Sequence, residues 1–169
     1  IFPRMTVLDN VMIPMHSKPT YSMWTAMLGL PKVKAERARM EERAMKHLRD
    51  LDLDQYCDRE AGTLAYGLQR RLEIARALAA SPKMLLLDEP AAGMNNDECN
   101  ELVDLLKRIQ KEYDLTVILI EHHIEFVMRL CSRIYVLNLG RLLAEGSPEE
   151  IQNNPAVIEA YLGQRRTKK

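Results

Sequence analysis

The hydrophobic pattern of the chain changes its period near Ser81. Before this point, apolar residues recur mainly at helical spacing, with polar residues between them. After Pro82, short continuous apolar runs alternate with stretches of helical period. Strands that are apolar on both faces and alternate with helices are typical of a parallel sheet covered on two sides. The sequence therefore predicts a helical part over residues 1–80 and an α/β part over residues 81–169.

Four helices are predicted in the first part. Thr6 has the side chain of a helix N-cap, and Gly62 with Thr63 interrupts the pattern before the last helix. The predicted helices cover Val7–Pro14, Tyr21–Leu28, about Lys34–Leu51 (with apolar Ala38, Met45 and Leu48), and Leu64–Ala80.

The second part is predicted to alternate strands and helices. Arg133–Leu139 and Leu142–Ala144 are expected to pair as a hairpin across Gly140 and Arg141. The other expected strands are Met84–Leu87 and Leu115–Ile120, and the expected helices are Asp97–Tyr113, about Ile124–Cys131, Pro148–Asn153 and Pro155–Leu162, with a frayed basic tail over Arg165–Lys169.

Composition indicates a soluble globular chain and excludes several classes of partner. Of its 169 residues, 47% are hydrophobic, and 24 basic residues cancel 24 acidic ones. This balance gives no broad positive field for nucleic acid, and no apolar run approaches the roughly 20 residues of a spanning helix. We therefore expect no nucleic-acid partner and no direct membrane insertion. Three widely spaced cysteines suit a reducing compartment, and a chain that begins with Ile1 hints at a missing N-terminal part.

Two acids directly follow the first apolar run. Asp88 and Glu89 would face the crevice at the carboxyl end of a strand, where open α/β sheets bind ligands. An Asp there can hold Mg²⁺, and the adjacent Glu can polarise a water that attacks a phosphoryl group. In the alternative interpretation, Asp88 only caps the following turn and Glu89 is solvated.

The surrounding sequence favours phosphate chemistry. Leu64–Arg71 opens a long helix some twenty residues earlier, and Gly67 allows close approach of a ligand to the backbone. Amide groups at a helix N-terminus suit an anion such as a γ-phosphate. Glu121, His122 and His123 follow the next strand and place an imidazole at the same edge of the sheet.

These segments resemble motifs of the ATP-binding cassette (ABC) ATPases, over Phe2–Gly163. Leu64–Arg71 resembles the ABC signature, Leu85–Pro90 the Walker B strand, Ala91–Asn95 the D-loop and His122 the switch histidine. The detailed sequence of these motifs resembles the ATPases of branched-chain amino acid importers. Lipopolysaccharide-export ATPases share several of the same features. This finer resemblance is carried by Tyr66–Gly67, Arg70–Arg76, Asp88–Asn95 and Ile158–Gly163.

The resemblance implies a P-loop NTPase-like ABC ATPase fragment of α/β class, with a helical subdomain and a partial parallel sheet with covering helices. Residues 1–80 would be the helical subdomain, and residues 81–169 the C-terminal half of the RecA-like core. Two subunits, identical or different, would sandwich two ATP molecules. Asp88 would then hold Mg²⁺, Glu89 would be the general base, and His122 would contact the γ-phosphate. The residues implied for the nucleotide are Leu64, Ala65, Tyr66, Gly67, Leu68, Gln69 and Asn95.

The sequence departs from the general pattern of the family at several positions. Ala65 replaces the signature serine, Leu68 a glutamine, Asn95 the D-loop aspartate, and His123 the acid that commonly follows the switch histidine. A phosphate-binding Walker A loop needs Gly-Lys-Ser/Thr, and none of the seven glycines is followed by Lys. The Q-loop glutamine of the family would fall just before Ile1. We therefore expect the later portion of an ABC ATPase, which is inactive alone.

By the same resemblance, the partners would be a second ATPase subunit and a membrane permease. The protein would then be cytoplasmic and peripheral on the inner face of the plasma membrane through that permease. A methionine-rich stretch could dock the permease or simply pack in the helical subdomain; it contains Met12, Met15, Met23, Trp24 and Met27. His16 and His47 are expected at the surface. A non-catalytic interaction module is the alternative for the chain alone, and neutral charge disfavours an ABC protein that acts on DNA or ribosomes.

Overall fold

The computed structural model describes residues 1–17 and 31–162. The helix expected at Tyr21–Leu28 and the tail from Arg165 lie outside these residues. The chain forms two compact units: the first comprises Ile1–Pro90 and Arg108–Leu119, and the second comprises Ala91–Lys107 and Ile120–Lys169. The boundary expected between residues 80 and 81 rests on hydrophobic period rather than compactness, and it stays a prediction.

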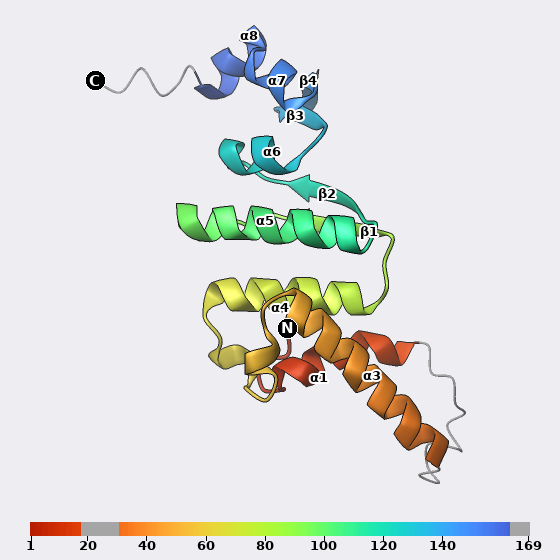
Figure 1. The fold of residues 1–169 in the computed structure, drawn as a ribbon. Helices are drawn as coiled ribbons and strands as arrows, with labels where there is room; N and C mark the ends of the chain where they lie inside the picture. Colours follow the sequence, from red (N-terminus) through yellow and green to blue (C-terminus); the bar gives the residue numbers. More distant parts are fainter. Residues whose placement is uncertain (18–30, 163–169) are drawn as a thin grey trace. The chain divides into compact units, whose positions relative to one another are not determined.

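Three helices pack against one another in the first unit (Figure 1): α1 (Val7–Met12), α3 (Pro31–Asp50) and α4 (Tyr66–Ala79). The predicted Thr6 cap is confirmed, because its side chain accepts a hydrogen bond of 3.0 Å from Asp9 N. On α3 the buried side chains are those of Met40, Ala44, His47 and Leu48, whereas Ala38 is exposed. Short 3-10 helices cover Ile13–Ser17, Asp54–Tyr56 and Ala61–Thr63.

The strands β1 (Met84–Asp88) and β2 (Thr116–Ile120) form a two-stranded sheet, and α5 (Asn96–Glu112) lies between them in sequence. Thr116 N donates to Lys83 O at 3.0 Å, so both strands begin at the same end and run parallel. The expectation that both faces are buried is wrong, because exposed and buried residues alternate along β1. Leu86 is 69% and Ile120 is 65% exposed, so these strands show an apolar face to solvent among the described residues.

The second unit contains α6 (Ile124–Leu130) and the predicted hairpin of β3 (Ile134–Asn138) and β4 (Arg141–Gly146), which pair antiparallel. Its two-residue loop has positive φ at Leu139 (48°) and Gly140 (75°), as a type I′ turn requires. The helix expected at Pro148–Asn153 is α7 (Pro148–Gln152). The helix expected at Pro155–Leu162 is divided into α8 (Pro155–Val157) and a π-helix over Ile158–Leu162. A small core joins β3 to α7 and α8 through Ile134, Ile151 and Val157.

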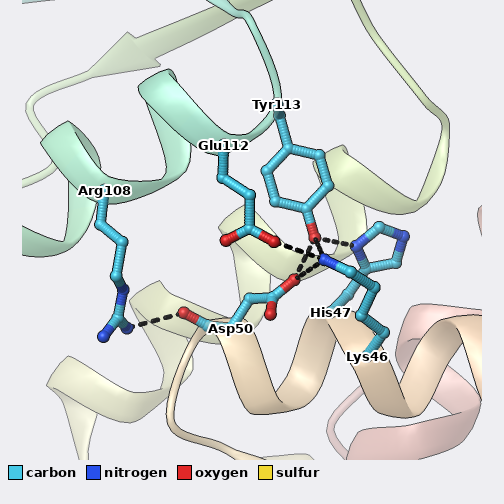
Figure 2. Close-up of polar contacts among 6 residues, drawn as sticks. All are labelled: Lys46, His47, Asp50, Arg108, Glu112 and Tyr113. Atoms are coloured by element: carbon cyan, nitrogen blue, oxygen red, sulfur yellow. Dashed lines mark hydrogen bonds and ion pairs between the residues drawn. The ribbon is translucent and has the colours of Figure 1, made fainter.

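A polar cluster joins α3 to the C-terminal end of α5 within the first unit (Figure 2). Lys46 Nζ donates to the carboxylates of Asp50 at 2.7 Å and Glu112 at 2.5 Å. Tyr113 Oη donates to Asp50 and lies 2.8 Å from His47 Nδ1. The surface position expected for His47 is therefore wrong, since it is only 7% exposed.

Ionisation in this cluster follows from burial and from these bonds. Burial and the hydrogen bond to Asp50 raise the pKa of Tyr113 to about 12. Burial lowers the pKa of His47, so the neutral imidazole is favoured. Although burial alone would raise it, the pKa of Asp50 is lowered because Lys46 and Tyr113 donate to its carboxylate. The cluster therefore combines a protonated phenol with a paired carboxylate at one contact between helices.

No helix among residues 1–17 and 31–162 is long and apolar enough to cross a membrane.

Candidate active site

Asp88 is the last residue of β1, Glu89 follows it directly, and both are exposed. Glu89 has φ 45°, in the left-handed region that residues with a β-carbon seldom adopt. Strain of this kind persists only where the surrounding chain imposes it, and it concentrates at functional sites. The turn therefore presents two carboxylates at the end of a strand, with the backbone of the second held in an unusual conformation.

The donor set at this turn suits a hard cation that is shared with a phosphate. Mg²⁺ is commonly held by one or two carboxylates, with water and substrate phosphates as its other ligands. Asp88 supplies such a carboxylate, while the described residues contain no group of three or more His, Cys, Asp or Glu side chains able to hold a metal. Asp88 therefore fits a cation that is shared with a phosphate.

The residues that follow form a tight turn and then cap α5. Met94 N donates to Ala91 O at 3.2 Å, and Gly93 has φ 76°, which a type II turn requires at this position. Asn95 Oδ1 accepts from Glu98 N at 3.0 Å, while Asn95 N donates to Glu98 Oε2 at 2.9 Å. This reciprocal pair is a capping box, so Asn95 is the N-cap that precedes α5. A role of Asn95 toward a nucleotide stays a prediction.

The segment before α4 is anchored at one end and lacks a side-chain cap at the other. Leu64 is 6% exposed, and its carbonyl accepts from Gln69 Nε2 at 2.8 Å. Ala65 occupies the N-cap position and makes no side-chain hydrogen bond to the helix. The serine that Ala65 replaces would cap the helix, whereas alanine leaves the first amide groups of α4 without a side-chain acceptor.

The first turn of α4 also leaves room for a ligand or partner. A β-carbon built at Gly67 meets nothing within 4 Å, so this chain's own packing does not require glycine there. Tyr66 is 48% exposed, and its Oη accepts from Arg70 Nη2 at 2.7 Å. Leu68 is half-buried. These observations fit a surface against which another molecule closes.

The two histidines after β2 lie in different environments. The side chain of His122 is 73% exposed. His123 is half-buried, and its Nδ1 is buried without a hydrogen-bond partner among the described residues. His123 lines a cavity of about 150 Å³ between the first turns of α5 and α6, together with Asn96, Cys99, Asn100, Val103, Glu125 and Phe126.

The candidate residues are divided between the two units. Asp88, Glu89 and the segment Leu64–Gln69 belong to the first unit, whereas Asn95 and His122 belong to the second. Within each unit the structure places them at exposed strand ends and at helix N-termini. Their catalytic and binding roles stay predictions.

Comparison with known families decides the class of protein. Residues 1–92, more than half of the chain, match the family described as "ABC transporter". The chain belongs to the ABC transporter family. Residues 141–166 also match the family described as "Branched-chain amino acid ATP-binding cassette transporter". The predicted membership of the ABC family is therefore confirmed, and the family is one of nucleotide-binding proteins.

Individual ABC proteins resemble most of the chain. It is 42% identical over 164 residues to the high-affinity branched-chain amino acid transport ATP-binding protein LivG of Salmonella typhimurium. It is 34% identical over 163 residues to the lipopolysaccharide export system ATP-binding protein LptB of Acidithiobacillus ferridurans. These matches cover 97% and 96% of this chain, but only 64% and 61% of the relatives.

A solved structure confirms the fold. MJ1267, an ATP-binding cassette of an ABC transporter in its ADP conformation, matches with a TM-score of 0.75 and 29% identity. That match covers 96% of this chain and 64% of the MJ1267 chain. The chain thus spans about two thirds of the length of its ABC relatives.

Proposed function

We propose that the chain is part of the ATP-hydrolysing subunit of an ABC transporter that powers import of branched-chain amino acids. The observation that carries the hydrolytic role is the end of β1, where Asp88 is followed by Glu89 in a left-handed conformation. The importer assignment is supported by the match over residues 141–166 and by the LivG relatives. LptB supports lipopolysaccharide export as a second candidate, but at lower identity.

Glu89 is proposed to act as the general base. Its carboxylate takes a proton from a water while the oxygen of that water bonds to the γ-phosphorus of ATP. The bond from the γ-phosphorus to the bridging oxygen breaks, and ADP leaves with the electron pair. Asp88 would hold Mg²⁺, which when bound neutralises charge on the phosphates. His122, with its exposed imidazole, would donate a hydrogen bond to a γ-phosphate oxygen.

The segment Leu64–Gln69 is proposed to act on the nucleotide of a second subunit. The first amides of α4 lack a side-chain cap, and space is open around Gly67. An anion is stabilised there by the N–H groups and by the positive end of the helix dipole. Asn95, which caps α5, would carry contacts across the same dimer interface.

The phosphate-binding loop must come from elsewhere in the protein. None of the glycines of this chain precedes a lysine, and the chain spans 64% of LivG. We propose that the chain belongs to a longer subunit which supplies this loop, and that the chain alone does not hydrolyse ATP. The longer subunit would pair with a second ATPase subunit and bind a membrane permease on the cytoplasmic face.

The test is Glu89→Gln in that longer protein, with Glu41→Gln on the exposed face of α3 as the matched control. Loss of a general base lowers steady-state hydrolysis by roughly 100-fold or more, while MgATP still binds. The control retains the parental rate. Hydrolysis by Glu89→Gln at the parental rate would show that Glu89 is not the base.

A further inference from the structure

Glu121 is a charged residue at a position where the pattern of β2 places inward-facing side chains. Exposed and half-buried residues alternate along β2, and Val117 and Leu119 are half-buried. Glu121 continues this inward phase just beyond the strand, and its side chain is only 1% exposed. A carboxylate removed from water must recover its hydrogen bonds from the protein.

Backbone N–H groups from two separate segments supply these bonds. Glu121 Oε1 accepts from Ala91 N at 2.9 Å. Glu121 Oε2 accepts from His122 N at 2.9 Å and from His123 N at 3.2 Å. Hydrogen bonds to a carboxylate are stronger than those between neutral groups. The carboxylate also reaches α5 electrostatically, since burial and then the Glu121 charge raise the pKa of the Cys99 thiol.

The two segments that Glu121 joins are those next to the proposed catalytic groups. Ala91 is buried, begins the turn that ends at Met94, and is separated from Glu89 only by Pro90. The fixed φ of proline leaves few rotatable bonds between Glu89 and the anchored amide of Ala91. On the other side, the bonds hold the backbone of His122, whose side chain is 73% exposed and whose Nδ1 lies 3.9 Å from Glu121 Oε2.

We propose that Glu121 is a positioning residue for ATP hydrolysis, which holds the turn after Glu89 and the backbone of His122 at a fixed separation. The proposal rests on the proposed function, because it concerns the groups that would activate water and contact the γ-phosphate. Each carboxylate oxygen serves one segment, so both oxygens are needed. Glutamine has the same shape but only one oxygen, and its NH₂ group would face an N–H group that cannot accept a hydrogen bond.

The kinetic test compares Glu121→Gln with Glu150→Gln in the longer protein. Glu150 is a suitable control, because its carboxylate also accepts a backbone N–H, from Ser147 at 2.7 Å, but at the cap of α7. Misplacement of reacting groups predicts that Glu121→Gln lowers kcat by roughly 10- to 100-fold. The KM for ATP and the midpoint of thermal unfolding should match those of Glu150→Gln. A kcat equal to that of the control, or a loss explained by unfolding or raised KM, would overturn the proposal.

Hydrogen–deuterium exchange without nucleotide provides a readout that does not depend on activity. In the parent, the amides of Ala91, His122 and His123 should exchange slowly, and Glu121→Gln should accelerate exchange in both segments. Fast exchange at Ala91 in the parent, or no change in the variant, refutes the link. If the parent does not hydrolyse ATP, the proposed function fails, whereas the exchange result still decides whether Glu121 joins the two segments.

Discussion

The glycine in the first turn of α4 offers a substitution with opposite expected effects on stability and on hydrolysis. A β-carbon at Gly67 meets no atom within 4 Å, and φ there is not positive. Gly67→Ala therefore introduces no clash, and it lowers the conformational entropy of the unfolded chain. The expected gain in the free energy of unfolding is about 0.4–1 kcal/mol. For a domain of this size, this corresponds to roughly 1–4 °C in the unfolding midpoint.

The rate of hydrolysis should fall, because the nucleotide of the second subunit is proposed to approach the backbone at Gly67. An added methyl group displaces that nucleotide by about 1 Å, which predicts a loss of roughly 100-fold in kcat/KM. The assays are thermal unfolding followed by circular dichroism and steady-state phosphate release by the longer protein.

Gly62→Ala is the matched control, since it makes the same chemical change a few residues away. A β-carbon at Gly62 would lie 2.9 Å from Pro3 Cβ and 3.0 Å from Pro3 O. This clash predicts a loss of stability of roughly 1–3 kcal/mol. Normal hydrolysis by Gly67→Ala would refute the signature role, and destabilisation by Gly67→Ala would refute the packing argument.

Two further predictions concern stability. The raised pKa of Tyr113, about 12, means that the folded protein favours the protonated phenol, so its stabilisation is present below the ordinary pKa of 10 and lost as pH rises toward 12. In Tyr113→Phe, the free energy of unfolding should therefore fall less between pH 10 and about 12 than it does in the parent. Urea unfolding at several pH values measures this, and an equal fall in both proteins would contradict it. Leu139 is 96% exposed with φ 48°, so Leu139→Asn, which suits a type I′ turn before Gly140, should stabilise the protein by roughly 0.5–1 kcal/mol. Leu142→Asn, on the exposed side of β4, should bring no such gain in thermal unfolding, and an equal gain in both variants would rule out turn geometry as the cause.

Local pattern was sufficient to predict most of the elements. The expected helix at Asp97–Tyr113 appears as α5 over Asn96–Glu112, because its apolar face repeats over several turns. The start of α4 was predicted two residues early. Leu64 has helix-compatible hydrophobicity but an extended backbone, with ψ 148°, and it is buried ahead of the N-cap.

Contacts between distant residues could not be predicted in the same way. His47 is buried because it meets Tyr113, 66 positions away, and no local pattern indicates this pair. The exposed face of β1 was missed because a continuous apolar run does not show what covers each side. The burial of Glu121 could have been predicted, because Glu121 continues the inward phase of Val117 and Leu119. Its hydrogen bond from the amide of Ala91, 30 positions away, could not.

The candidate catalytic residues could be predicted from short motifs and from the order of these motifs along the chain, because the chemistry requires particular residue types within a few positions of one another. Asp88 and Glu89 stand where a strand ends, as predicted. Their assembly with a phosphate-binding loop and with a second subunit depends on chain segments that no pattern in these residues describes.

Calorimetric titration of MgATP tests the central claim most directly. These residues are proposed to supply the acids, the switch histidine and the signature, while another part of a longer protein supplies the phosphate-binding loop. We therefore expect no measurable heat of tight binding for residues 1–169 alone, and binding near the micromolar range for the longer protein. Micromolar binding by residues 1–169 alone, or no binding by the longer protein, would contradict this proposal.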